Sequence, residues 1–349
     1  MNPQIQQAFK DQATSCRALG SPFTARICMA FVENLRPDST LGNIINNWQG
    51  DPTGTGDALA LRLCGALHAL ILDDSDDILK AAYPDNMHKW SDDALWSAIQ
   101  HALNTHEPFL ISRLKSAPQT NEIRRCGALV PGFLEVANHF NWPLVLSEIG
   151  SSAGLNLNWD QYQYSFGSKI WGKKDSPIHL LPEWSGPTPH VDNLEILSRK
   201  GCDLNPLDMT NKQDQLRLLS YIWPDQIDRI ERTRQAIAIA QDHVPKIAKS
   251  GAADWLEQRL TTQYDNAIHI VYHSIMWQYL SSDEQNRCRK ALETAGAKAD
   301  KNSSLAWLRL EADDEKEGAG IYLTLWPTGK TTLIGRADFH GRWVNWIGL

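Results

Sequence analysis

The chain has 349 residues, of which 42% are hydrophobic, so it can bury a large core and form two domains. Its 41 Asp and Glu residues outnumber its 34 Lys and Arg residues, and the net charge of −7 argues against a nucleic-acid partner. No apolar run reaches the length of a membrane span and the first residues do not resemble a secretory signal, so we expect a cytoplasmic protein without a membrane partner.

The first part of the chain reads as helical. Apolar residues recur every three or four positions, as in amphipathic helices, over residues 21–35, 56–72 and 91–114. Ser21, Asp57 and Ser91 stand where helix N-caps are expected. We therefore predict an N-terminal all-helical domain over residues 1–140, which caps a ligand cleft.

From residue 141 onward, apolar strand patterns alternate with helical ones, which is typical of an α/β sheet. We expect strands at residues 144–149, 162–167, 267–276, 304–312, 321–327 and 331–339. The last two are joined by a tight turn and form an antiparallel hairpin. Residues 141–349 are thus predicted to form a Rossmann-like, mostly parallel sheet with a C-terminal hairpin.

The six cysteines are scattered along the chain without a C-x-x-C pair. This pattern argues against both a zinc site and a disulfide framework. We therefore expect no metal and interpret the cysteines as mostly reduced core residues.

The stretch LVLSEIGSSAGLNLNWD, residues 144–160, has two possible functions. Gly150, Ser152 and Gly154 match the G-x-S-x-G nucleophile elbow of serine hydrolases. An elbow follows several strands, however, whereas this one follows only predicted helices. His273 or His340 could complete a triad, but a chain of this length offers some histidines by chance.

The same stretch also matches E-x-G-x-x-x-G, the loop that cradles S-adenosylmethionine. In this interpretation Gly150 and Gly154 let the backbone approach the ligand, and the next helix directs its N-terminus toward it. Glu148 would supply an anion for the ammonium and sulfonium groups of the ligand. A nicotinamide-binding loop is less suitable, because its third glycine would fall on Leu155.

A second polar group follows the apolar segment 267–276. Because substrates lie at the carboxyl ends of central parallel strands, the candidate substrate-binding residues are Tyr272, Ser274, Trp277 and Gln278. His273 is the candidate catalytic base, for an acceptor that must lose a proton. The alternative is that His273 forms a hydrogen bond in the core.

Several segments together resemble a bacterial family of unknown function with a class I methyltransferase-like core. They are APQTNE, EIGSSAGLNLNWD, GCDLNPLD, LRLLSYIWPDQ, VYHSIMWQYL and FHGRWVNW. The resemblance implies that Glu148, Gly150, Ser152 and Gly154 contact the methionine part of S-adenosylmethionine. Asp203 or Asp208 would hold the ribose hydroxyls, with turn or cap roles as the alternative.

Three functions follow from these patterns. The leading one is transfer of a methyl group from S-adenosylmethionine to a small molecule. The second is a non-catalytic binding protein on the same fold, and the third is a serine hydrolase that uses Ser152. The sequence gives no indication of the oligomeric state.

Overall fold

The chain divides into two compact units with separate hydrophobic cores. The computed structural model describes residues 1–84, 89–190, 194–315 and 317–349. Unit 1 consists of residues 1–120 and 210–234. Unit 2 consists of residues 121–209 and 235–349. Residues 121–140, which we expected in the helical domain, thus belong to unit 2, because their helix packs on the sheet.

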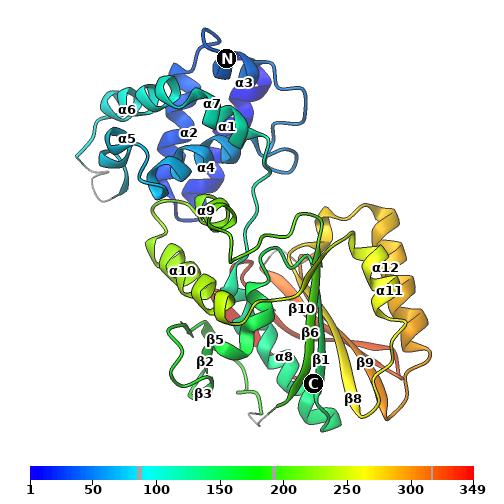
Figure 1. The fold of residues 1–349 in the computed structure, drawn as a ribbon. Coiled ribbons are helices and arrows are strands. Elements are labelled where there is room, and N and C mark those ends of the chain that lie inside the picture. The colour runs from blue at the N-terminus through cyan, green and yellow to red at the C-terminus, as the bar shows by residue number, and fades with distance from the viewer. Residues whose placement is uncertain (85–88, 191–193, 316) are drawn as a thin grey trace. The chain divides into compact units, whose positions relative to one another are not determined.

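Unit 1 contains only helices among its described residues (Figure 1). They are α1 (Pro3–Ala18), α2 (Pro22–Asn34), α3 (Thr40–Asn46), α4 (Leu59–Leu72), α5 (Asp77–Ala81), α6 (Asp92–Thr105), α7 (Glu107–Leu114) and α9 (Lys212–Ser220). Helix α10 (Ile227–Asp242) begins in unit 1 and ends in unit 2. The buried side chains of α1, α2 and α4 form the centre of the core, with Phe9, Phe31 and Leu67 fully buried.

Two of the three predicted N-caps are confirmed. The Ser21 hydroxyl accepts from the backbone N–H of Thr24, and the Ser91 hydroxyl accepts from that of Ala94. Asp57 was wrongly interpreted as a cap. The N-cap of α4 is Ala58, at φ +51° and without a side-chain hydrogen bond, while Asp57 accepts from the indole N–H of Trp48 at 2.8 Å.

Unit 2 is built on a nine-stranded sheet with the order β5-β12-β11-β10-β9-β8-β1-β6-β7. Its strands are β1 (Leu144–Ile149), β5 (Glu183–Ser185), β6 (Ile196–Asp203), β7 (Ile247–Lys249), β8 (Ala267–Ser274), β9 (Ser303–Glu311), β10 (Ala319–Trp326), β11 (Lys330–Ala337) and β12 (Trp343–Trp346). A second, three-stranded sheet contains β2 (Gln163–Phe166), β3 (Lys169–Gly172) and β4 (His179–Leu180). The fold of this unit is therefore mixed α/β.

The large sheet is mostly parallel. From β7 through β6, β1 and β8 to β9, all neighbours pair parallel, whereas β9, β10, β11 and β12 pair antiparallel. The predicted antiparallel hairpin is confirmed as β10–β11. The chain adds β6 and β7 on one side of β1 and then β8 and β9 on the other. The carboxyl ends of β1 and β8 therefore form a topological switch point, where ligands bind in open α/β sheets.

Helices cover both faces of this sheet. Neighbouring residues of a strand point to opposite faces, and Trp307 and Leu308 of β9 show which helices lie on each. Trp307 packs in one core with α11 (Ala252–Arg259) and α12 (Ser282–Gly296). Leu308 lies against α8 (Cys126–Phe140), where a Cβ on Gly132 would come within 2.7 Å of it. Figure 1 shows α11 and α12 side by side next to β8 and β9.

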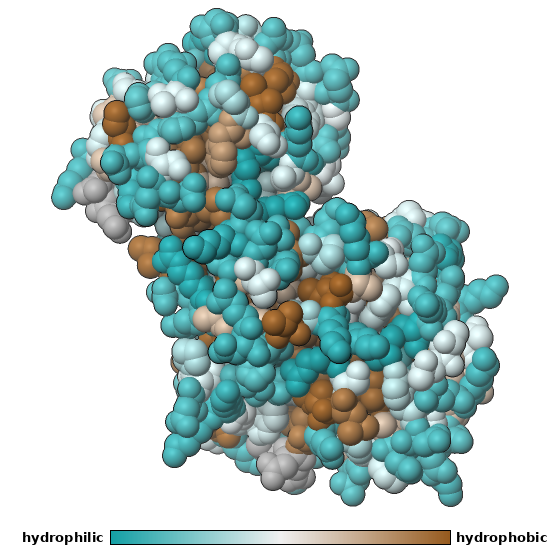
Figure 2. Space-filling model, in the orientation of Figure 1, coloured by the Kyte–Doolittle hydropathy of each residue, from teal (hydrophilic) through white to brown (hydrophobic). Residues whose placement is uncertain are grey.

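Polar residues dominate the surface that Figure 2 shows, with separate hydrophobic clusters between them. Among the described residues, the structure contains no helix with the length and apolar character needed to cross a bilayer.

Candidate functional site

The candidate site begins at the turn after β1. Gly150, Ser152 and Gly154 all have left-handed backbone conformations, with φ of +68°, +54° and +69°. Glycine adopts this conformation without strain, whereas a serine does so at a cost. Ser152 is therefore held in place by its surroundings: its N–H donates to Asp203 Oδ2 at 2.8 Å, and its carbonyl accepts from the Leu207 N–H at 3.2 Å.

The backbone N–H groups of this turn are largely engaged within the protein. Ser151 N–H donates to the Cys202 carbonyl at 3.0 Å, and Gly154 N–H donates to the Ser151 carbonyl at 2.7 Å. Leu155 N–H donates to Asn121 Oδ1 at 2.9 Å. A phosphate cradle needs free N–H groups directed at the anion, so this turn is poorly suited to a pyrophosphate.

The glycines of the turn also pack against protein. A Cβ on Gly150 would come within 3.0 Å of the Met276 side chain, and one on Gly154 within 2.7 Å of Pro245. We expected both glycines to let the protein backbone approach a ligand closely. In the structure, the space beside each is filled by a side chain from a distant part of the chain, so the glycines permit positive φ and close packing.

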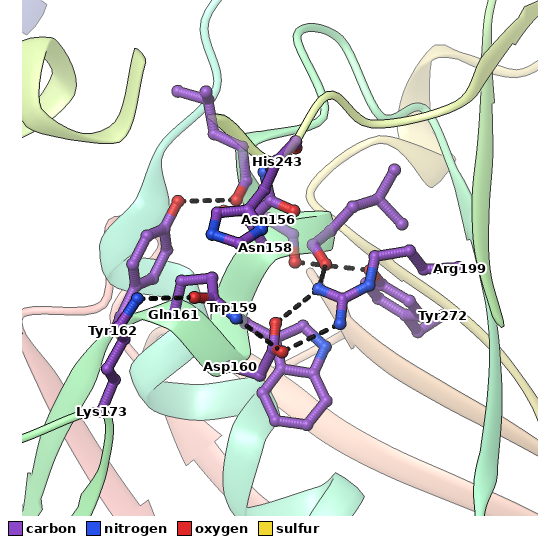
Figure 3. Close-up of polar contacts among 12 residues, drawn as sticks. Asn156, Asn158, Trp159, Asp160, Gln161, Tyr162, Lys173, Arg199, His243 and Tyr272 are labelled. Carbon is purple, nitrogen blue, oxygen red and sulfur yellow. Dashed lines mark hydrogen bonds and ion pairs between the residues drawn. The ribbon is translucent and has the colours of Figure 1, made fainter. Parts of the chain in front are cut away.

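The predicted helix after the turn is instead the 3-10 segment η3 (Leu155–Gln161), with a non-helical residue at Asn158. Arg199 holds this segment: it forms an ion pair with Asp160 and donates to the Leu157 carbonyl at 2.8 Å (Figure 3). Asn158 Nδ2 donates to the His243 carbonyl at 2.8 Å, also seen in Figure 3. Such a short, kinked segment provides no helix dipole for an anion, and we correct that part of the prediction.

Two acidic residues end neighbouring strands at this point. Glu148 is the penultimate residue of β1 and is only 3% exposed, and Asp203 is the last residue of β6. Asp203 accepts backbone N–H groups through both oxygens, from Ser152 and, at 2.8 Å, from Asn205. The sequence left Asp203 and Asp208 as equal candidates. The structure places Asp203 at the strand end, whereas Asp208 is exposed in the following loop.

The Glu148 carboxyl is in an unfavourable environment for a charge. Burial raises its pKa well above the ordinary value, and the negative charge of Asp203 raises it further. The Arg125 guanidinium and a hydrogen bond from Ser151 act in the opposite direction. Glu148 Oε2 is buried and has no hydrogen-bond partner among the described residues. A cationic donor placed against this oxygen would relieve the desolvation cost.

The loop after β8 contains the other predicted site residues. Tyr272 pairs with Glu148 across β1 and β8 but is fully buried, with its ring against Phe133. Its hydroxyl donates to the Asn156 carbonyl at 3.4 Å. In this structure Tyr272 belongs to the core next to the site, and its side chain is not exposed to a substrate.

His273 is fully buried, and both of its ring nitrogens have protein partners. Nδ1 lies 2.6 Å from Glu311 Oε1, and the Trp307 indole N–H donates to Nε2 at 3.1 Å. An indole N–H is only a donor, so Nε2 must be the acceptor and Nδ1 carries the proton that Glu311 accepts. This geometry leaves no nitrogen to take a proton from a substrate, so the assignment of His273 as catalytic base needs correction.

His273 instead helps to position the loop that follows. Trp277 stacks on its ring, with centroids 5.0 Å apart. Glu311 Oε1, which accepts from His273, also accepts the backbone N–H of Met276 at 3.1 Å. Met276 in turn fills the space beside Gly150. Sequence reasoning missed Glu311, which links the two loops of the site.

The remaining predicted substrate-binding residues are dispersed around this loop. The Ser274 carbonyl accepts from Arg125 Nη1 at 3.3 Å. Trp277 lies in η4 (Trp277–Tyr279) and stacks under the guanidinium of Arg289, whereas Gln278 is exposed. The contact of this loop with the turn is made by the side chain of Met276, beside Gly150.

Ser152 does not have the surroundings of a nucleophile. Its hydroxyl is buried and forms no hydrogen bond with any described residue, histidines included. A serine nucleophile requires a base within hydrogen-bond reach, and the buried histidine of this region, His273, is engaged with Glu311 and Trp307. The hydroxyl therefore remains a buried hydrogen-bonding group without a partner among the described residues.

Comparison with known proteins identifies the family of this chain. No curated protein and no solved structure matches it. Residues 6–346, nearly the entire chain, match the family described as "Uncharacterized protein conserved in bacteria (DUF2332)". The chain therefore belongs to this conserved bacterial family.

Proposed function

We propose that unit 2 binds S-adenosylmethionine at the carboxyl ends of β1 and β6 and transfers its methyl group to a small molecule. The observation that carries this proposal is the pair of acidic residues at two adjacent strand ends, Glu148 and Asp203, together with the unpartnered, buried Oε2 of Glu148. Two acidic side chains at the carboxyl ends of adjacent parallel strands, beside the switch point between β1 and β8, suit a cationic nucleoside. The engaged N–H groups of the turn argue against a pyrophosphate ligand.

The residues of the site have separate tasks in this proposal. Glu148 accepts the ammonium group of the ligand through Oε2. Asp203, whose oxygens each have a further lone pair, accepts the ribose hydroxyls, and the Ser152 hydroxyl donates to or accepts from the methionine part. When bound, S-adenosylmethionine supplies an electrophilic methyl group. In-line transfer of that group depends above all on the alignment of the acceptor.

The His273–Glu311–Met276 network supports this alignment role. It fixes the loop after β8 against Gly150, and so it defines one wall beside the turn. An acceptor that is already nucleophilic needs no base. Because His273 has no free nitrogen, the proposed substrates are of this kind, such as thiolates or unprotonated amines.

A non-catalytic binding protein is the second candidate function. It is favoured by the same observation, that the histidine nearest the turn is committed to Glu311 and Trp307. The two functions share the ligand and differ in turnover. A methyl-transfer assay with radiolabelled S-adenosylmethionine and a pool of small thiols and amines separates them.

Isothermal titration calorimetry with S-adenosylmethionine and its demethylated product tests the binding site itself. Glu148→Gln removes the charge but keeps the shape of the side chain. We expect it to weaken binding roughly ten- to a hundredfold, the effect of losing a charge-assisted hydrogen bond. The matched control is Glu293→Gln on the exposed side of α12, which should leave affinity unchanged. Absence of binding by the wild type at millimolar ligand would rule out the proposal.

A further inference from the structure

Unit 1 contains two arginines with unsatisfied, buried donors. Arg113 lies in the last turn of α7 and Arg217 lies in α9, and both helices pack against α4. The Nε atom of each guanidinium is buried and has no hydrogen-bond partner among the described residues. Buried N–H groups of charged side chains are normally paired, so these two donors need an explanation.

Ser220 connects the two arginines. Arg113 Nη2 donates to the Ser220 hydroxyl at 2.7 Å, and that hydroxyl donates to the Arg217 carbonyl at 2.9 Å. Tyr221, the next residue, donates through its hydroxyl to the Ser116 carbonyl at 2.8 Å. These bonds leave both Nε–H groups without an acceptor among the residues that the structure describes.

The cluster also lacks a counterion. No carboxylate of the described residues forms an ion pair with Arg113 or Arg217. Burial raises the pKa of Tyr221, and a third arginine, Arg62, also acts to lower it. Arg62 has a counterion, however: its guanidinium lies 3.6 Å from the Asp57 carboxylate and donates to the carbonyls of Asp57 and Leu114. Burial lowers the pKa of Arg113, and the positive charge of Arg217 lowers it further, so the two guanidinium groups repel each other.

We propose that Arg113 and Arg217 form an anion-binding site in unit 1, which takes a carboxylate or phosphate group of a small molecule. A guanidinium offers several N–H donors in a rigid fork and binds both kinds of anion bidentately. An anion between the two side chains would satisfy the buried Nε donors and cancel the repulsion. The site is independent of the function proposed for unit 2, because every residue in it belongs to unit 1.

Thermal unfolding of the full chain tests this site. Sodium phosphate is titrated in one arm and sodium succinate in the other, with sodium chloride added to keep the ionic strength constant. The wild type is compared with Arg217→Gln and Arg113→Gln. The matched control is Arg36→Gln, which removes an exposed arginine of unit 1 whose guanidinium donates to the carbonyls of Glu33 and Leu35.

We expect phosphate or succinate to raise the melting temperature of the wild type and of Arg36→Gln alike. Arg217→Gln should lose the effect, with affinity for the anion reduced roughly ten- to a hundredfold. In chloride alone, Arg217→Gln should melt no lower than the wild type, because it removes a repulsion. A rise with phosphate alone identifies a phosphate site, and a rise with both identifies a general anion site.

Two results would overturn the proposal. One is a wild-type melting temperature that neither anion changes at constant ionic strength. The other is an equal rise in wild type and Arg217→Gln, which would place anion binding elsewhere. Arg217→Gln is the deciding variant if Arg113→Gln fails to fold, since Arg113 Nη2 bonds Ser220 whereas Arg217 Nε has no partner among the described residues.

Discussion

The Glu148 carboxyl provides a test of the site that needs no ligand. Its pKa in the folded chain lies well above the ordinary value of 4.5, because the carboxyl is buried and faces Asp203. The folded state therefore keeps this proton to a higher pH than the unfolded state does. The stabilising contribution is complete below pH 4.5 and is lost as the pH rises through the folded-state pKa.

The size of the effect follows from linkage. While folded Glu148 is protonated and unfolded Glu148 is ionised, the free energy of unfolding falls by up to about 1.4 kcal/mol per pH unit. Glu148→Gln imitates the protonated form at every pH and removes this slope. The stability of the variant relative to the wild type should thus increase with pH, and then level off above the folded-state pKa.

Urea unfolding followed by tryptophan fluorescence measures this difference from about pH 5 to about pH 8. Glu293→Gln, an exposed control on α12, should parallel the wild type throughout. Parallel curves for wild type and Glu148→Gln would refute the reasoning, because they would mean that Glu148 is ionised equally in both states. Ligand binding should have the opposite pH dependence. A bound cation favours ionised Glu148, so affinity should rise with pH and binding should release protons. Calorimetry in buffers of different ionisation enthalpy measures this proton release.

Four further variants test the roles assigned around the turn. His273→Ala should cost about 3 to 5 kcal/mol of stability, because it leaves a cavity and leaves the Trp307 indole N–H without an acceptor. Glu311→Gln keeps an oxygen that can accept from His273 and should cost less. Urea unfolding midpoints compare the two variants. Gly154→Val should lower the melting temperature with or without ligand, because its Cβ would clash with Pro245 at positive φ. Ser152→Ala should preserve stability and weaken ligand binding by about 0.5 to 1.5 kcal/mol, and covalent labelling of wild-type Ser152 by a fluorophosphonate would contradict its assigned role.

Much of the sheet could be predicted from the sequence, because its central strands are buried on both faces. Residues 144–149 and 267–274 are almost continuously apolar, and both form central parallel strands. Strand β6 was harder to delimit. It carries Arg199 and Lys200, and only Gly201 and Cys202 in it are buried, so no apolar pattern marks its end at Asp203. For this reason Asp203 could not be separated from Asp208.

The contacts of the site depended on residues far apart in the chain. A sequence shows that a histidine follows a strand, but the partners of His273 come from β9, 34 and 38 residues further on. The boundary between the two units was also hard to predict, because it depends on contacts between residues far apart in the chain. Residues 210–234 follow strand β6 of the large sheet in the sequence, yet Trp223 packs on the core of unit 1 and α9 contacts α4.

The glycine turn shows why a short motif does not decide between functions. Positive φ at Gly150 and Gly154 is required by a ligand cradle, by a nucleophile elbow and by simple close packing. The structure shows close packing at both glycines, so the motif alone is not evidence for a ligand. Glu148 and Asp203 then remain as the features that favour a cationic ligand. Two ionised carboxyl groups at adjacent strand ends, one buried with an unpartnered oxygen, are costly to a fold, and either protonation of Glu148 or a bound cation relieves that cost.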